Sequence, residues 1–186
     1  SDTPMERDTI FRIYSMTKPI TSLAFMMLVE SGLVGLEDPL SRFIPQFKSV
    51  KVHGDDGQLM DLAREMTMYD LLIHTSGLSY GGVDDTGGPV DKLYDKSNLF
   101  DVNAPLEELV ARLAELPLAY QPGTVWHYSL STDVIGRIIE IVAAMPLSEF
   151  LGENIFSAIG MEDTAFMVEP GKMDRLATLY GKTESS

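Results

Sequence analysis

Apolar residues recur every three or four positions in several stretches of the chain, which is the spacing of helices that bury one face. The first stretch runs from Thr17 to Ser31, and Gly32 follows it as a suitable C-terminal stop. A second follows Asn103, which we expect to cap a helix, and a third opens at Ser131 and ends before Pro146. The pattern therefore predicts a mainly helical domain.

Shorter elements are expected between these helices. The segment Asp8 to Tyr14 alternates apolar and polar residues, which favours a strand or an extended segment. Leu36 to Phe47 contains two prolines and predicts a turn followed by short helical pieces. A further helix is expected to start at Ser148.

Two further features lie within residues 67–98. Thr67 and Asp70 match a capping box, which predicts a short helix that continues through His74 to a stop at Gly77. The segment from Ser79 to Asn98 is rich in Gly and Asp and shows neither the period of a helix nor that of a strand, so we interpret it as a long surface loop.

Composition narrows the classes of function. A chain of 186 residues with 45% hydrophobic content is long enough to bury a core. The formal net charge of -14 repels phosphate backbones and anionic lipids, so we expect neither a nucleic-acid nor a membrane partner. The chain has no Cys, which is compatible with a reducing compartment, and its start lacks the apolar core of a signal peptide. We expect a cytoplasmic location.

The first candidate for chemistry is the pair Ser15 and Lys18, three residues apart at the start of the first helical stretch. Residues with this spacing are neighbours on a helix, so the amine can reach the hydroxyl and help to deprotonate it. The helix N-terminus adds partial positive charge where an oxyanion would form. The alternative is an N-cap serine followed by a solvated lysine.

Four stretches in order, FRIYSMTKP (11–19), LLIHTSGL (71–78), PGTVWHYSL (122–130) and ENIFSAIGMEDTAF (153–166), resemble the serine β-lactamase and penicillin-binding-protein superfamily. The resemblance is strongest to the carboxylesterases called family VIII, and it runs from about Pro4 to Phe166. It implies an α+β fold of β-lactamase/transpeptidase type, of which this chain would form mainly the helical subdomain with the serine helix.

The resemblance also implies roles. Ser15 matches the acyl-accepting serine, Lys18 its lysine partner, and Tyr128 the tyrosine taken as general base and later as proton donor to the leaving group. A nearby ammonium favours the phenolate form of a tyrosine, so the role is physically sensible. Without the motif, Tyr128 would be read as a half-buried aromatic with a satisfied hydroxyl.

Two departures from the family pattern are informative. Leu130 stands where β-lactamases and penicillin-binding proteins carry an asparagine that binds the substrate's amide group. Because leucine neither donates nor accepts a hydrogen bond, the departure favours ester substrates. The third motif, Lys-Thr-Gly or an esterase variant, is absent, since Lys182-Thr183 lacks the glycine and a surrounding strand.

We therefore expect one partial domain. Residues 1–14 would be an extended segment of the α/β part, 15–160 the mainly helical part with both motifs, and 161–186 the return toward the α/β part. Most of the antiparallel sheet would be missing, which leaves apolar surface exposed. We expect the remainder of the same protein, as another chain or as segments outside this sequence, or a homo-oligomer to cover it.

Other side chains are candidates for substrate contact. Met16 beside the nucleophile would line an acyl pocket, Tyr80 would border the entrance, and Trp126 would form a pocket wall, although a core or surface role fits each. Leu130 completes the expected substrate-binding set. The histidines lack metal-ligand spacing, and His74 is interpreted as a structural hydrogen-bonding residue.

These observations together predict a serine hydrolase, a carboxylesterase that cleaves short-chain esters of small molecules through a Ser15 acyl-enzyme without a cofactor. One alternative is a D,D-peptidase or β-lactamase, which a penicillin probe distinguishes. The other is a non-catalytic helical domain or fragment that binds a partner.

Overall fold

The structure is a computed structural model that describes residues 4–82, 87–101 and 103–181. Its helices are α1 (Thr17–Glu30), α2 (Met68–Leu72), α3 (Pro89–Lys96), α4 (Leu106–Leu113), α5 (Ser131–Ala143) and α6 (Leu147–Leu151). Strands β1 (Val52–His53) and β2 (Leu59–Met60) pair antiparallel, with Val52 opposite Met60. Short 3₁₀ turns cover Tyr14–Met16, Leu40–Arg42, Pro45–Ser49, Ser157–Ile159 and Pro170–Arg175, and a π turn covers Gly152–Phe156.

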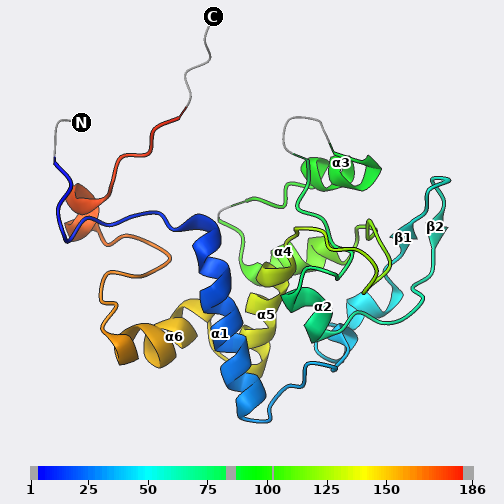
Figure 1. Ribbon diagram of the computed structural model, residues 1–186, viewed down its shortest axis with the longest axis horizontal. Helices are drawn as coiled ribbons and strands as arrows, with labels where there is room; N and C mark the ends of the chain where they lie inside the picture. The colour runs from blue at the N-terminus through cyan, green and yellow to red at the C-terminus, as the bar shows by residue number, and fades with distance from the viewer. Residues whose placement is uncertain (1–3, 83–86, 102, 182–186) are drawn as a thin grey trace, which may run out of the picture.

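Helix α5 is the centre of the helical packing. It contacts α1, α2, α4 and α6, and Figure 1 shows α1 and α5 running side by side. Its buried residues Val134, Ile135, Ile138 and Ile139 follow the three- and four-residue spacing seen in the sequence. A Cβ on Gly136 would lie 3.0 Å from Leu147, so the missing side chain lets α6 approach closely.

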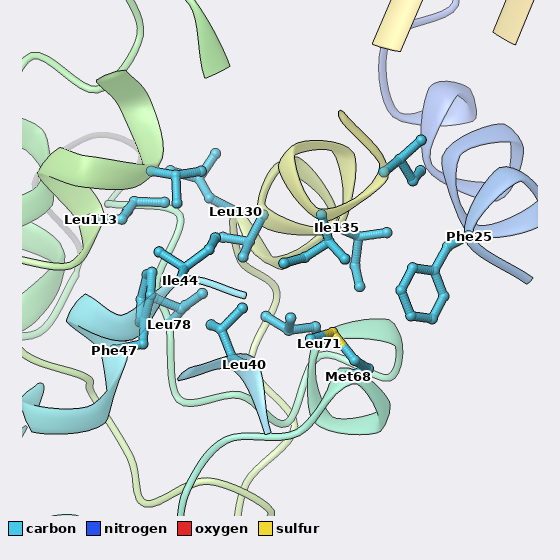
Figure 2. Packing of buried hydrophobic residues seen from close by; sticks show 14 of the residues in the cluster. Phe25, Leu40, Ile44, Phe47, Met68, Leu71, Leu78, Leu113, Leu130 and Ile135 are labelled. Carbon is cyan, nitrogen blue, oxygen red and sulfur yellow. The ribbon is translucent and has the colours of Figure 1, made fainter. Parts of the chain in front are cut away.

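The core joins segments that are far apart in sequence. Figure 2 shows Phe25 of α1 and Met68 and Leu71 of α2 beside Ile135 of α5. All four side chains are fully buried. Truncating such a residue to alanine typically costs about 2–5 kcal/mol, so this cluster fixes the position of α1 relative to α5.

Helix α1 carries apolar residues on its exposed side as well as on its buried side. Ala24, Phe25 and Leu28 are buried against the core, whereas Leu23 and Met26 are 53% and 41% exposed. A helix of this kind is normally covered on all sides. The expected exposed apolar surface is therefore present on α1, and what covers it in the whole protein stays a prediction.

The two ends of the described chain lie together at one edge (Figure 1). Ile10 and Leu176 form an isolated parallel bridge, and the Arg175 guanidinium donates to the backbone oxygen of Asp8 and to the Asp163 carboxylate. The segment predicted as extended at residues 8–14 thus makes one bridge and then enters the 3₁₀ turn at Tyr14.

Several predictions about local structure are confirmed. Helix α1 ends at Glu30 and Gly32 has φ +71°, and two 3₁₀ turns lie between Leu40 and Ser49. The capping box is present, because Thr67 Oγ1 accepts from the Asp70 N–H while Asp70 accepts from the Thr67 N–H.

The predicted loop at 79–98 is wrong in its second half, where α3 forms, while residues 83–86 lie outside the described part. Pro89 starts α3, Asp91 accepts from the Gly88 N–H, and Val90 and Tyr94 are buried one turn apart. The burial of that pair outweighs the Gly- and Asp-rich composition.

Three predicted helix boundaries are also wrong. Helix α2 ends at Leu72, and His74 takes a left-handed conformation with φ +57° instead of continuing the helix. Helix α4 starts after Pro105, not at Asn103, and α6 starts after Pro146, before Ser148. In both cases a proline stands at the N-cap position, and no side chain caps the helix by a hydrogen bond.

Among the helices of the described residues, none has both the length and the apolarity that a membrane span requires.

Candidate active site

Ser15 sits at the middle of the 3₁₀ turn Tyr14–Met16, immediately before α1. The Met16 N–H donates to the Ile13 carbonyl at 2.9 Å, and Tyr14 has φ +44°. A non-glycine residue in this region costs of order 1–3 kcal/mol, and such residues cluster at functional sites. The strained turn presents the Ser15 side chain at the surface, at the N-terminal end of α1.

Lys18 lies in the first turn of α1, on the side of the helix that faces two aromatic rings. Its Nζ is 4.8 Å from the centroid of the Tyr128 ring and 5.8 Å from that of Tyr80. Both distances are within the range of cation–π attraction. The ammonium is therefore held beside the phenol of Tyr128.

The segment His74–Ser79 positions the second motif through backbone hydrogen bonds. The His127 N–H donates to the His74 carbonyl at 2.8 Å, and the Leu130 N–H donates to the Ser79 carbonyl at 3.2 Å. Gly77 has φ +84°, and a Cβ there would lie 2.1 Å from the Tyr120 carbonyl oxygen. Glycine is therefore required where the two segments approach.

These elements bring together the three residues for which the sequence predicts catalysis. Ser15 Oγ and Tyr128 OH form a hydrogen bond of 2.7 Å between residues 113 positions apart. The Tyr128 ring stacks on His74 at 5.0 Å between centroids and tilts against Tyr80 at 5.4 Å. The hydroxyl of Ser15 thus meets Tyr128, with Lys18 next to the phenol.

The electrostatics of the site favour a phenol that gives up its proton readily. Burial raises the pKa of Tyr128. Hydrogen bonds to Lys18 and Ser15, together with the charge of Lys18, lower that pKa by more than burial raises it, so the pKa lies below its ordinary value. A tyrosine with a lowered pKa is ionised more often near neutral pH and can then accept the Ser15 proton.

Asp133 belongs to the same neighbourhood, although sequence reasoning did not single it out. It lies in the first turn of α5 and lines the same cavity as Ser15 and Lys18. Burial raises the pKa of Asp133, and the charge of Lys18 offsets part of that rise. Its position five residues after Tyr128, at a helix start, was the available signal.

A cavity of about 670 Å³ opens beside Ser15. Its apolar lining includes Tyr14, Pro105, Leu106, Leu147 and Phe166. Lys18, Asp133 and Glu140 also line it, so its lining carries side chains of both charges.

The four predicted substrate-binding residues lie in different places. Tyr80 lines the cavity. Met16 and Trp126 are 63% and 65% exposed and do not line it, and Leu130 is 3% exposed and packs in the core. Figure 2 shows Leu130 among core side chains. Their roles toward a substrate stay predictions.

Within the described residues, no group of three or more His, Cys, Asp or Glu side chains is arranged to hold a metal ion. His74 makes a hydrogen bond through Nδ1 to Ser129 Oγ at 3.2 Å. Lys182-Thr183, which the sequence analysis rejected as a third motif, lies outside the described part of the chain.

Comparisons with known proteins agree with this arrangement. The family described as Beta-lactamase matches residues 1–186. Protein Rv1367c of Mycobacterium tuberculosis is 39% identical over 95% of this chain and 44% of its own length. Esterase EstB of Burkholderia gladioli is 35% identical over 95% of this chain and 43% of its own length. The solved structure of EstCE1, described as a hydrolase with promiscuous acyltransferase activity, matches with a TM-score of 0.79 and 33% identity over 97% of this chain and 45% of that chain.

The chain thus spans less than half the length of these relatives. Its described residues form the mainly helical part of a β-lactamase-like fold, with one two-stranded sheet. The match along the whole chain shows that it belongs to the β-lactamase family, within the superfamily of serine β-lactamases and penicillin-binding proteins, near its esterases.

Proposed function

We propose that this chain carries the nucleophile and the general base of a serine carboxylesterase that cleaves short-chain esters. The observation that carries the proposal is the 2.7 Å hydrogen bond between Ser15 Oγ and Tyr128 OH, with the Lys18 ammonium beside the Tyr128 ring. A serine hydroxyl needs a base within hydrogen-bond reach to attack a carbonyl, and this geometry provides one.

In the proposed acylation, the Tyr128 phenolate takes the proton of Ser15 while Oγ bonds to the ester carbonyl carbon. The tetrahedral intermediate collapses, the bond to the alcohol oxygen breaks, and Tyr128 returns the proton to that oxygen. In deacylation, water attacks the acyl group, Tyr128 accepts its proton, and Ser15 recovers it as the acid leaves. Lys18 stabilises the phenolate, and the Ser15 N–H contributes to oxyanion binding.

The apolar cavity lining and Leu130 support small esters over the acylamino substrates of the peptidase and β-lactamase alternative. Apolar side chains, among them Pro105, Leu106 and Phe166, line the cavity beside Ser15, which suits a small neutral ester. Leu130 offers no hydrogen-bonding group and is buried in the core, which also removes a partner for an acylamino group.

Acyl transfer to an alcohol is the second candidate. EstCE1, which is 33% identical to this chain, is described as having promiscuous acyltransferase activity. Ser15 is exposed and the cavity beside it is open, so an alcohol could replace water in deacylation. Product analysis with an added alcohol would separate the ester of that alcohol from the free acid.

The test is the intact mass of the whole protein before and after reaction with a fluorophosphonate, followed by peptide mapping. We expect one adduct, located on Ser15, and turnover of a short-chain ester that Ser15→Ala lowers by about 10⁴-fold or more. Ser22→Ala is the matched control, because Ser22 lies on α1 outside the cavity lining. Labelling by penicillin with no ester turnover would favour the alternative, and absence of any Ser15 adduct would contradict both.

A further inference from the structure

Three serine hydroxyls form a hydrogen-bonded chain behind Tyr128. Ser76 Oγ lies 2.7 Å from Ser131 Oγ, Ser131 Oγ lies 2.6 Å from Ser129 Oγ, and Ser129 Oγ lies 3.2 Å from His74 Nδ1. Ser76, Ser129 and Ser131 have no exposed surface. Water therefore does not satisfy these hydroxyls, and each hydroxyl hydrogen must find its acceptor within the chain of serines and His74.

The direction of each bond follows from counting donors. Ser76 Oγ accepts from the Leu78 N–H at 3.1 Å, and its other partner among the described residues is Ser131 Oγ. A buried hydroxyl with one donor places it on the available acceptor, so Ser76 donates to Ser131. Ser131 Oγ then accepts from Ser76 and must donate to its remaining partner, Ser129 Oγ.

The same count fixes the last bond. Ser129 Oγ accepts from the Ser131 hydroxyl and also from the Ser131 N–H at 3.4 Å, which uses both lone pairs. Its own hydrogen is left for His74 Nδ1, which must therefore be an unprotonated acceptor. A neutral imidazole with a bare Nδ1 carries its proton on Nε2.

We propose that this serine chain fixes His74 as a neutral imidazole with its proton on Nε2, and that His74 thereby acts as a positioning residue for Tyr128. A proton on Nδ1 would face the Ser129 hydrogen. Accommodating it would require all three hydroxyls to reverse and would leave the Ser76 hydrogen without an acceptor, which is costly in a buried site.

Other groups around the imidazole act in the same direction. Among the described residues, Lys18 of α1 and Tyr128 of the second motif are the titratable groups that face it. Burial lowers the pKa of His74, and the positive charge of Lys18 lowers that pKa further. The left-handed backbone of His74, with φ +57°, aims its ring at Tyr128 and its carbonyl at the His127 N–H.

The consequence for catalysis rests on the proposed esterase chemistry. With His74 neutral, Lys18 is the one positive charge that acts on Tyr128 from the described part of the chain. An imidazolium stacked 5.0 Å from the phenol would place a second positive charge beside Tyr128 and shift its pKa in the pH range where histidine gains a proton. The serine chain therefore keeps the charge beside Tyr128, and with it the pKa of Tyr128, constant as the pH falls toward the usual pKa of histidine, about 6.5.

The first test is nitrogen NMR of the whole protein with isotope-labelled histidine, because the shifts of the two ring nitrogens distinguish a bare from a protonated nitrogen. His74→Asn assigns the signal. We expect Nδ1 to be bare and Nε2 to be protonated, and this state to persist when the pH is lowered below the pKa of free histidine. A protonated Nδ1 at neutral pH would overturn the proposal, whether or not the protein hydrolyses esters.

The second test breaks the chain with Ser131→Ala and uses Ser157→Ala as the matched control, since the Ser157 hydroxyl is exposed and donates to a backbone carbonyl. In Ser131→Ala we expect the pKa of His74 to rise, and the pH profile of Ser15 labelling to show an additional inflection at that pKa, which the wild-type profile lacks. An unchanged His74 titration and pH profile in folded Ser131→Ala would contradict the role of the chain. A wild-type protein whose Ser15 never reacts would contradict the esterase proposal alone.

Discussion

The Tyr14–Lys18 motif and the His127–Ser131 motif each contribute one hydroxyl to the same hydrogen bond, but the chain supports them differently. The first lies on an exposed 3₁₀ turn, with Tyr14 and Met16 both 63% exposed. The second is backed by fully buried serines and by backbone bonds to residues 74–79.

The difference shows how the work of the site is divided. The nucleophile sits on a strained turn at the end of a helix, where an approaching substrate can reach it. The base, Tyr128, is supported by the buried serines and by residues 74–79, which we call the platform. The platform fixes the distance of the base to Ser15 and the charges that surround it. Substitutions should therefore affect reactivity on the first side, and both reactivity and stability on the second.

Removing the hydroxyl that the second motif contributes is expected to have the largest effect. Tyr128→Phe should lower the rate of Ser15 acylation by about 10²–10⁴-fold, because it removes the general base. The unfolding free energy should change little, since the ring and its stacking on His74 remain. Stopped-flow labelling and denaturant unfolding measure the two quantities. Tyr69→Phe on α2, at a 47% exposed position, is the control and should leave both unchanged.

Breaking the platform beneath the second motif should cost stability instead. Asp70 is 2% exposed and accepts hydrogen bonds from Arg64, Thr67 and Thr75. Asp70→Ala leaves the Thr67 and Thr75 donors unpaired and should destabilise the protein by about 1–3 kcal/mol in denaturant unfolding. Asp61→Ala at an exposed ion pair should cost far less, because water solvates both partners. Equal losses in the two variants would remove the distinction between the platform and the surface.

The same carboxylate predicts a pH dependence. Burial raises the pKa of Asp70, but bonds from Arg64 and Thr67 lower it more, so the folded-state pKa lies below the unfolded value of 3.8. Its contribution to stability is complete above 3.8 and disappears as the pH falls through the lower folded-state pKa. The unfolding free energy of the wild type should fall in this acid range, and that of Asp70→Ala should fall by less, as denaturant unfolding at several pH values would measure.

The smallest expected effect concerns the strained turn of the first motif. Tyr14→Gly should raise the unfolding free energy by up to about 1 kcal/mol, because glycine adopts φ +44° without a steric penalty. Labelling of Ser15 should nevertheless slow, because the turn becomes more flexible. Asn98→Gly relieves a similar φ of +47° far along the chain and should leave labelling unchanged. Faster labelling in Tyr14→Gly would show that the strain does not help to present Ser15.

Local rules predicted features that depend on neighbours in sequence. The helix from Thr17, the helix from Ser131 and the Thr67–Asp70 capping box were all visible, because spacing and capping chemistry act within one or two turns. Helix α3 was missed since its composition resembles a loop and its stability comes from burying Val90 and Tyr94 against distant residues.

The sequence by itself determined which chemical groups are present and in what order: Ser15 with Lys18 one turn along, and Tyr128 in a motif that ends in leucine. Only the tertiary structure decided that Ser15 and Tyr128 share a hydrogen bond across 113 positions, that Asp133 joins their cavity, and that Leu130 turns into the core. It also joined Ser76 to Ser131 across 55 positions. These contacts depend on how α1, α2 and α5 pack, and hydrophobic packing between distant segments is not encoded in local periodicity.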